Sequence, residues 1–507
     1  MTRTFPALHL LPLPLLAALA LLPGNTAHAQ TAAPPMKVTT RTCGAYTVRL
    51  AQNGFDDPPD RAAVLQGDRV VASVQDTAVE VQFCRDVTGD GVPELMLMGY
   101  SGGAHCCSTH TLYALTRPPR QLMSVFSADT PELVPRQLDG RGPLELLGLD
   151  WRFAYAYDLS FAGSPALPRV YSYLQGHYVD NTRAFPGVAL GRTRRGTDIA
   201  PGEALNDYAT LLVFGRAGQA DTYLQGLPDT YRAWLSNYAP DIRQNLSDFG
   251  LQDWPVRAGL PAGQDRIGVG GAFSAPLTTE YLALVQDEQG SASLRLYRPQ
   301  GAGITAGPAL LRIPFTSDYG DGSVPNVLPV FTVRRADGRD DAVLRDARSG
   351  SVTYRVWRVN ATSAVDRQDD ALVVATRLMA DLSSLAGHVA ATYSGTPRTA
   401  TQRAEAQRRV QVALARAERW RVGGPQDLPL ERLGAFTVDA VWMPEDTGSS
   451  ARVLATVDAG TVAADQKDEY VASERRTLTV NLSRGEDGWQ VSDWTLAPRE
   501  GSAPDGG

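Results

Sequence analysis

The chain of 507 residues is long enough for several domains, and a composition of 43% hydrophobic and 20% charged residues is typical of globular rather than disordered protein. The net charge of −7 at pH 7 provides no general attraction to nucleic acid or anionic membranes, so we expect neither as a partner. Composition alone leaves binding, structural and enzymatic roles open.

The first 29 residues have the pattern of a secretory signal. Arg3 precedes a long apolar stretch, which ends in the small-residue triplet AHA at 27–29. A membrane anchor is the alternative, but the stretch contains Pro12 and Pro14 and is short for a span of about 20 residues. We therefore expect cleavage near Ala29 and a secreted or periplasmic mature protein without a membrane span.

Two regions, 37–190 and 265–362, are predicted to be all-β, because short alternating or apolar segments stand between turn-forming residues. Between them, 201–256 has aromatic and aliphatic residues at helical spacing, which predicts two or three helices. The predicted strands are YTVRLA, RVVASV, VEVQFC, ELMLMG, STHTLYAL, LELLGL and RVYSYL in the first region, and EYLALVQ, SLRLYR, NVLPVFTV, DAVLRD and VTYRVWRV in the second.

The region 366–497 is predicted to be a separate α+β domain. Helices are expected over 369–393 and 399–421, the second of which is rich in Ala, Arg and Glu, with Thr399 or Thr401 as its cap. Four strands follow, AFTVDAVWM, ARVLATVDAGTV, RRTLTVNLSR and GWQVSDWTL, and residues 498–507 read as a disordered tail.

An internal repeat suggests the architecture of the β regions. The segment DVTGDGVPELMLMG at 86 is echoed by QLDGRGPLELLGLD at 137 and VRRADGRDDAVLRD at 333. An aromatic-containing segment follows each one: STHTLYAL, RFAYAYDLSF and VTYRVWRV. The pattern resembles the FG-GAP/VCBS repeat family. That resemblance implies propeller blades of four antiparallel strands with an aspartate-rich loop in each blade, and we find three or four candidate blades.

The fold class predicted from these patterns is therefore a β-rich multidomain protein. It combines propeller-blade-like antiparallel modules, a helical insert and a C-terminal α+β domain. The last of these, about 366–497, is similar to the nuclear-transport-factor-like (SnoaL-type) fold, in which the domain often walls a small pocket.

The first acidic loop has the spacing of a calcium site. Asp86, Thr88, Asp90 and Glu94 occupy positions 1, 3, 5 and 9, and the carbonyl of Val92 would be the ligand at position 7. Thr88 is a weaker ligand than Asp or Asn. The alternative is a metal-free turn in which the carboxylates accept hydrogen bonds from backbone N–H groups.

The other two copies lack parts of this ligand set. Gln137 replaces the first ligand and Arg141 the third in the second copy, where the guanidinium would bond the remaining acids. The third copy has Val333 and Arg335 at its first two ligand positions, although it keeps Asp337 and Asp341. We expect no ion in either copy.

All four cysteines lie in the first β region, at Cys43, Cys84, Cys106 and Cys107. The sequence HCCSTH at 105–110 invites a zinc or redox interpretation, but adjacent cysteines do not have the usual zinc spacing and no C-x-x-C is present. An even number of cysteines in an exported chain favours disulfides. We expect Cys43–Cys84 with a vicinal Cys106–Cys107 bridge, and crossed pairing is the alternative.

No catalytic residue is assigned, because no nucleophile elbow, P-loop, HExxH or dinucleotide fingerprint is present. His177 and His388 are expected to be structural. The adjacent carboxylates Asp56-Asp57, Asp340-Asp341 and Asp369-Asp370 read as turns, although a glycosidase-type pair depends on spatial separation and so stays open.

The leading hypothesis is an exported, non-enzymatic structural or interaction protein, whose calcium- and disulfide-stabilised modules present a surface to an unknown protein or glycan at the cell envelope. The alternative is a secreted hydrolase or a carbohydrate- or ligand-binding protein. Its site would lie at the propeller axis or in the C-terminal cone.

Overall fold

The structure of the chain is a computed structural model. The predicted signal at 1–29, the Asp56-Asp57 pair and residues 499–507 of the predicted tail lie outside the described residues. The described ranges are 36–55, 58–190, 199–261, 266–286, 291–301, 303–314, 327–346, 352–393, 399–462 and 473–498.

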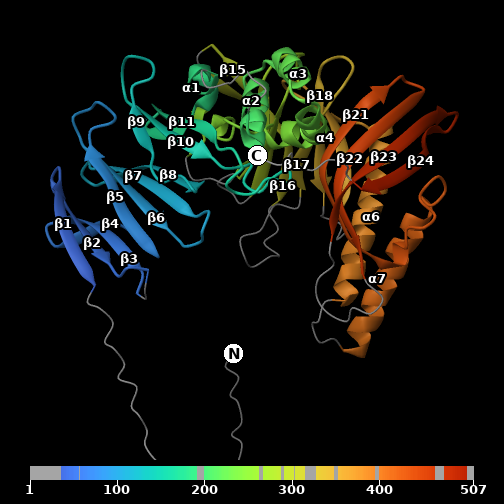
Figure 1. Cartoon of the computed structure of the whole chain (residues 1–507), viewed down its shortest axis with the longest axis horizontal. Helices are drawn as coiled ribbons and strands as arrows, with labels where there is room; N and C mark the ends of the chain where they lie inside the picture. The colour runs from blue at the N-terminus through green and yellow to red at the C-terminus, as the bar shows by residue number, and fades with distance from the viewer. Residues whose placement is uncertain are drawn as a thin grey trace, which may run out of the picture.

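Six four-stranded antiparallel sheets follow one another in chain order, and each is a simple meander. In Figure 1 they are arranged along an arc, with β1–β4 at one end and β21–β24 at the other. Sheets 1 to 3 consist of β1 (Lys37–Cys43), β2 (Tyr46–Gln52), β3 (Asp60–Gln66) and β4 (Arg69–Asp76); β5 (Ala78–Arg85), β6 (Glu94–Tyr100), β7 (Ser108–Ala114) and β8 (Arg120–Ala128); and β9 (Val134–Arg136), β10 (Glu145–Asp150), β11 (Leu167–Leu174) and β12 (His177–Asp180). Sheets 4 to 6 consist of β13 (Arg266–Gly271), β14 (Glu280–Gln286), β15 (Ser291–Gln300) and β16 (Gly303–Pro314); β17 (Val327–Arg334), β18 (Asp340–Asp346), β19 (Thr353–Val359) and β20 (Ala364–Asp366); and β21 (Leu433–Asp446), β22 (Ser450–Thr461), β23 (Glu474–Gly485) and β24 (Gly488–Pro498).

Sheets 1, 2 and 3 pack face to face in succession, and the sequence of β6, in the middle sheet, fits this position. Side chains alternate between the two faces of a strand. Leu95 and Leu97 accordingly enter the core shared with sheet 1, whereas Met96 enters the core shared with sheet 3. A strand covered on both faces needs a continuous apolar run, which ELMLMG supplies.

Sheet 5 repeats this arrangement. Ala342 and Leu344 face the core shared with sheet 4, while Val343 faces a core built with the C-terminal helices. Stacked four-stranded sheets of this kind are propeller-like, so the predicted β-rich fold class is confirmed. In the described residues, five such sheets (β1 to β20) lie in the two predicted β regions, where the repeats led us to expect three or four blades. The sixth sheet belongs to the C-terminal α+β region.

In the described residues between β12 and β13, where the sequence predicts a helical insert, there are five helices. They are α1 (Pro186–Leu190), α2 (Pro201–Val213), α3 (Ala217–Gln225), α4 (Asp229–Asn245) and α5 (Trp254–Arg257), preceded by a 3-10 turn at Thr182–Ala184. Their core includes Phe153 and Tyr157 from the loop between β10 and β11. In Figure 1 the insert lies over the middle of the arc.

The C-terminal region is α+β, as predicted. Helix α6 (Ala371–Tyr393) packs against sheets 5 and 6, beside α7 (Ala400–Glu418) and a 3-10 turn at Leu430–Arg432. Thr399 caps α7: its hydroxyl accepts a bond from Gln402 N, and the Gln402 side chain accepts one from Thr399 N. Among the described residues, no helix is both long and apolar enough to cross a membrane. The proposed domain boundaries stay predictions.

Candidate functional site

The acidic turn between β5 and β6 is closed from inside by Glu94. This carboxylate is fully buried, and its Oε2 accepts hydrogen bonds from Val87 N (2.8 Å) and Thr88 N (3.2 Å). The Thr88 hydroxyl donates to Oε1 at 3.2 Å. Burial raises the pKa of Glu94, while these donors oppose the shift. Glu94 therefore ties the start of the turn to the start of β6.

The exposed carboxylates of the same turn also bond to its backbone. Asp86 accepts from Gly89 N at 2.6 Å and Gly91 N at 2.8 Å, and Asp90 accepts from Val92 N at 2.8 Å. Both glycines have positive φ, 77° and 83°, which a tight turn requires and glycine adopts without strain.

This geometry fits a calcium cage only in part. Asp86 and Asp90 keep lone pairs beyond those used by the backbone, but both Glu94 oxygens are committed to the turn. In the described part of the chain, no three Asp, Glu, His or Cys side chains are grouped so that they could hold a metal. Calcium at Asp86, Thr88, Asp90, Val92 and Glu94 stays a prediction.

We call the contact of Glu94 a carboxylate lock: a buried acidic residue at the start of a strand accepts a hydrogen bond from the backbone of the preceding turn. The same contact recurs in other sheets. Glu145, which opens β10, accepts from Leu138 N at 3.0 Å, at the second copy predicted from the sequence. Glu280 opens β14 and accepts from Ser274 N at 2.6 Å, and Asp60 opens β3 and accepts from Asn53 N at 2.6 Å. Sequence reasoning missed these last two, although each is an acidic residue directly before an apolar run, in DRAAVL and EYLALV.

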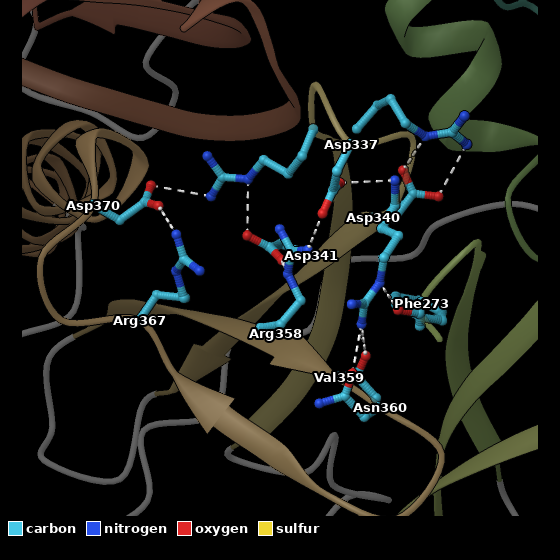
Figure 2. Close-up of polar contacts among 12 residues, drawn as sticks. Phe273, Asp337, Asp340, Asp341, Arg358, Val359, Asn360, Arg367 and Asp370 are labelled. Atoms are coloured by element: carbon cyan, nitrogen blue, oxygen red, sulfur yellow. Dashed lines mark hydrogen bonds and ion pairs between the residues drawn. The ribbon is translucent and has the colours of Figure 1, made fainter. Parts of the chain in front are cut away.

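In the third predicted copy, an arginine takes the place of the backbone donor (Figure 2). Arg335 Nε donates to Asp341 at 2.8 Å, and its NH2 group donates to Asp370 at 3.0 Å. Asp370 also accepts from Leu372 N at 2.9 Å and so caps α6. Burial alone would raise the pKa of Asp370, but Arg335 and the Leu372 N–H hold it below its usual value.

The other arginines of this network also have hydrogen-bond partners. Arg358 bonds both Asp341 and Asp337, and Arg334 bonds Asp340. Arg339 donates to the carbonyls of Phe273 and Val359, and to the Asn360 side chain. The ion pair of Arg335 with Asp370 ties sheet 5 to α6, and the hydrogen bond from Arg339 to the Phe273 carbonyl ties it to sheet 4. Figure 2 shows this network. The Asp340-Asp341 pair is thus bound to arginine, and its role is structural.

The predicted Cys43–Cys84 disulfide is confirmed, and it joins the end of β1 to β5. The structure also joins Cys106 to Cys107, in the loop between β6 and β7. Ser101 N donates to the carbonyl of Cys107 at 3.2 Å and closes this loop. With Cys107 at a φ of 141°, the loop is a tight bend.

This bend presents His105 to a second loop. The imidazole stacks on Phe161, with ring centroids 4.0 Å apart and planes 21° apart. Phe161 also stacks with Trp151, at 5.0 Å and 13°, and Tyr155 is tilted against Phe161 at 5.6 Å. We call His105, Trp151, Tyr155, Phe161 and the Cys106–Cys107 disulfide the aromatic loop surface.

Three of these rings lie in the segment RFAYAYDLSF and just before it, in the place that follows the second repeat. Residues 151–166 form turns, with positive φ at Tyr155, Tyr157 and Asp158. The helical insert holds this shape, because Trp234 Nε1 donates to the Tyr157 carbonyl at 3.0 Å and Tyr238 OH to Asp158 at 2.6 Å. Side-chain alternation in the segment therefore reflects contacts to the helices rather than strand pairing.

Polar atoms of the aromatic loop surface are left for a ligand. Among the described residues, neither the His105 ring nitrogens nor the Tyr155 hydroxyl has a hydrogen-bond partner. Trp151 Nε1 also has none, but it is buried and inaccessible to a ligand. Tyr155 is 62% exposed. The residues that follow Phe161 in the sequence line a pocket of about 350 Å³. It is lined by residues 162–166, Ala200, Gly202, Glu203, Asn206 and Asp207.

Two other features bear on the hydrolase alternative. A pocket of about 480 Å³ lies between α4, β13 and β17, but Asp248, the acidic residue in its lining, is paired with Arg152 at 2.9 Å. His110 Nδ1 lies 2.6 Å from Ser127 Oγ, yet both side chains are buried and inaccessible to substrate. Burial lowers the pKa of His110 to about 4. His177 begins β12 and His388 lies in α6.

Comparisons with known proteins do not place the chain in a family. No family model matches it, and no curated protein matches it. The solved structures that it resembles include a mutant of Aleuria aurantia lectin in complex with alpha-methyl-L-fucoside, with 9% identity over 94% of this chain and 97% of that chain. The TM-score is 0.19, and at that value the likeness carries no argument. The FG-GAP/VCBS and SnoaL-type resemblances stay predictions.

Proposed function

We propose that this chain is an exported, non-enzymatic binding protein that contacts a component of the cell envelope through the aromatic loop surface. The observation that supports this most directly is the ring stack of His105, Phe161 and Trp151, with Tyr155 exposed beside it. Exposed aromatic clusters on loops held by a rigid scaffold are typical of binding sites.

The backbone of these loops supports the same proposal. Residues other than glycine seldom adopt positive φ, and the cost is tolerated where neighbouring structure enforces it, often at ligand sites. Five of the eight such residues found in the described chain lie in the three loops at this end of sheets 1 to 3: Phe55, Cys107, Tyr155, Tyr157 and Asp158. The acidic turns of β5–β6 and β9–β10 lie at the opposite end of these sheets.

Export is the second part of the proposal. Two disulfides in one small region indicate an oxidising compartment, which agrees with the signal predicted at 1–29. The partner would therefore be met outside the cytoplasm. The arginine network and the carboxylate locks are structural in this account, since their groups bond one another.

Co-sedimentation with a cell-envelope fraction of the source organism tests the proposal. The mature chain should sediment with the fraction, and the double variant His105→Ala/Tyr155→Ala should lose at least nine-tenths of that retention. Leu277→Ala is the matched control, because Leu277 is 95% exposed and lies in the β13–β14 loop, outside the surface. Equal retention of the double variant and the wild type would refute the proposed surface.

A further inference from the structure

We infer that the ligand of the aromatic loop surface is a neutral carbohydrate; this inference rests on the proposed binding function and specifies its ligand. Three properties of the surface point to this class. They are its flat ring faces, its hydrogen-bonding ring nitrogens and hydroxyl group, and the covalent bend that orients His105.

The ring faces match the apolar face of a pyranose. Aromatic faces carry partial negative charge, and the C–H groups on one side of a sugar ring are weakly positive, so the two attract when stacked. His105, Phe161 and Trp151 lie nearly parallel, at 21° and 13°. Phe161 is the member in contact with both others, and the exposed imidazole of His105 and ring of Tyr155 are the faces that the stack offers to a ligand.

The polar atoms match hydroxyl groups rather than ions. Tyr155 OH can donate and accept, and the His105 imidazole offers two ring nitrogens for hydrogen bonds. Neither has a hydrogen-bond partner in the described structure. The nearby carboxylate of Asp158 is exposed and accepts a hydrogen bond from Tyr238 OH at 2.6 Å. No Arg, Lys, Asp or Glu is among the residues of the aromatic loop surface. A few convergent polar atoms beside apolar faces are typical of small-ligand sites.

The vicinal disulfide preorganises the surface. Gly102 and Gly103 have φ of 98° and 111°, and a Cβ on Gly103 would lie 3.0 Å from Cys106 Sγ, so the chain folds closely around the bridge. Tyr100 OH donates to the Gly103 carbonyl and fixes the bend further. Because an ordered loop loses little entropy on binding, a fixed His105 favours affinity for a weakly held ligand such as a sugar.

Chemical treatment of the envelope fraction separates this inference from the proposed function. Periodate, which cleaves the vicinal diols of sugars, should abolish retention of the wild-type chain, and protease treatment should leave it unchanged. If periodate has no effect and protease abolishes retention, the partner is a protein: the carbohydrate inference is then wrong, while the binding function stands. If the fraction never retains the chain, the proposed function itself fails.

Direct titration provides the second test. The full mature chain would be screened against immobilised neutral oligosaccharides of glucose, mannose, galactose and N-acetylglucosamine, and the best binder titrated by calorimetry. We expect His105→Ala and Tyr155→Ala each to weaken binding at least tenfold, and Tyr155→Phe, which keeps the ring, to weaken it less. Leu277→Ala should bind as the wild type does. Equal affinity of all variants, at unchanged melting temperature, or no binding to any sugar in the panel, would overturn the inference.

Discussion

Arg335 stands in the same relation to Asp341 as Thr88 does to Glu94. In each case a buried acidic residue at or next to the start of a strand is bonded by the residue six positions earlier, through Nε at 2.8 Å in one and through backbone N and hydroxyl at 3.2 Å in the other. Sheets 2 and 5 therefore have a buried acidic residue at the same place in the turn. The donor to it is an arginine side chain in sheet 5, and a backbone N–H and a hydroxyl in sheet 2. The arginine also links the turn to a second element, because its guanidinium NH2 group donates to Asp370 at the start of α6.

Replacing Arg335 should strongly destabilise the chain. Arg335→Met removes a donor from both Asp341 and Asp370, which are buried, and breaking a buried ion pair on one side costs about 3–5 kcal/mol. Denaturant unfolding followed by circular dichroism measures the loss. Arg408→Met is the control, since Arg408 is exposed on α7 and an ion pair in water, like the one it makes with Glu405, contributes little to stability. Equal losses in the two variants would contradict the proposed role of the network.

The two disulfides should differ in their effect on stability. Cys43–Cys84 joins residues 41 positions apart, so its removal as Cys43→Ala/Cys84→Ala frees a long loop in the unfolded chain and costs about 4 kcal/mol. Cys106→Ser/Cys107→Ser frees almost no loop and should cost about 1 kcal/mol, while reducing ligand binding. Thermal unfolding of both variants measures the difference. A larger loss in the second variant would show that the bend, rather than the long bridge, supports the fold.

His110 should make the protein sensitive to mild acid. Its pKa is about 4 in the folded chain and 6.5 in its ordinary state, so the unfolded chain binds the proton first as pH falls. The stability from neutral His110 is therefore complete above pH 6.5 and is lost as pH falls towards 4, by about 3 kcal/mol in total. Urea midpoints at pH 7 and pH 4.5 should differ more for the wild type than for His110→Asn. An unchanged difference would exclude this histidine as the cause.

The calcium prediction for the turn at 86–94 has a direct test. A site of the affinity usual in extracellular modules, about 10⁻⁴–10⁻³ M, would stabilise the chain by about 1–3 kcal/mol at 10 mM calcium. The melting temperature should rise by a few degrees with calcium but not with magnesium, and Asp90→Ala should remove the rise. Asp139→Ala, in the second acidic turn, is the matched control. A wild-type melting temperature that calcium does not change would leave only the hydrogen-bonded turn.

Local sequence patterns determined the elements of this fold. Alternating and apolar runs predicted most strands, helical spacing predicted the insert, and Thr399 was among the two predicted caps of α7. The repeat at 86, 137 and 333 marked three turns that occupy the same place in their sheets. These features are local, since a strand's face, a cap and a tight turn depend on neighbouring residues.

The candidate site depended on tertiary structure. His105 and Phe161 belong to loops of different sheets, and only the stacking of sheets 2 and 3 brings their rings to 4.0 Å. The alternating aromatics of 152–161 resemble a strand, but helix α4 bonds the backbone at Tyr157 and holds it in turns. Sequence alone predicted a disulfide bend at Cys106-Cys107 and did not show what the bend presents. Contacts between distant loops decide that, because their geometry is set by how whole sheets pack.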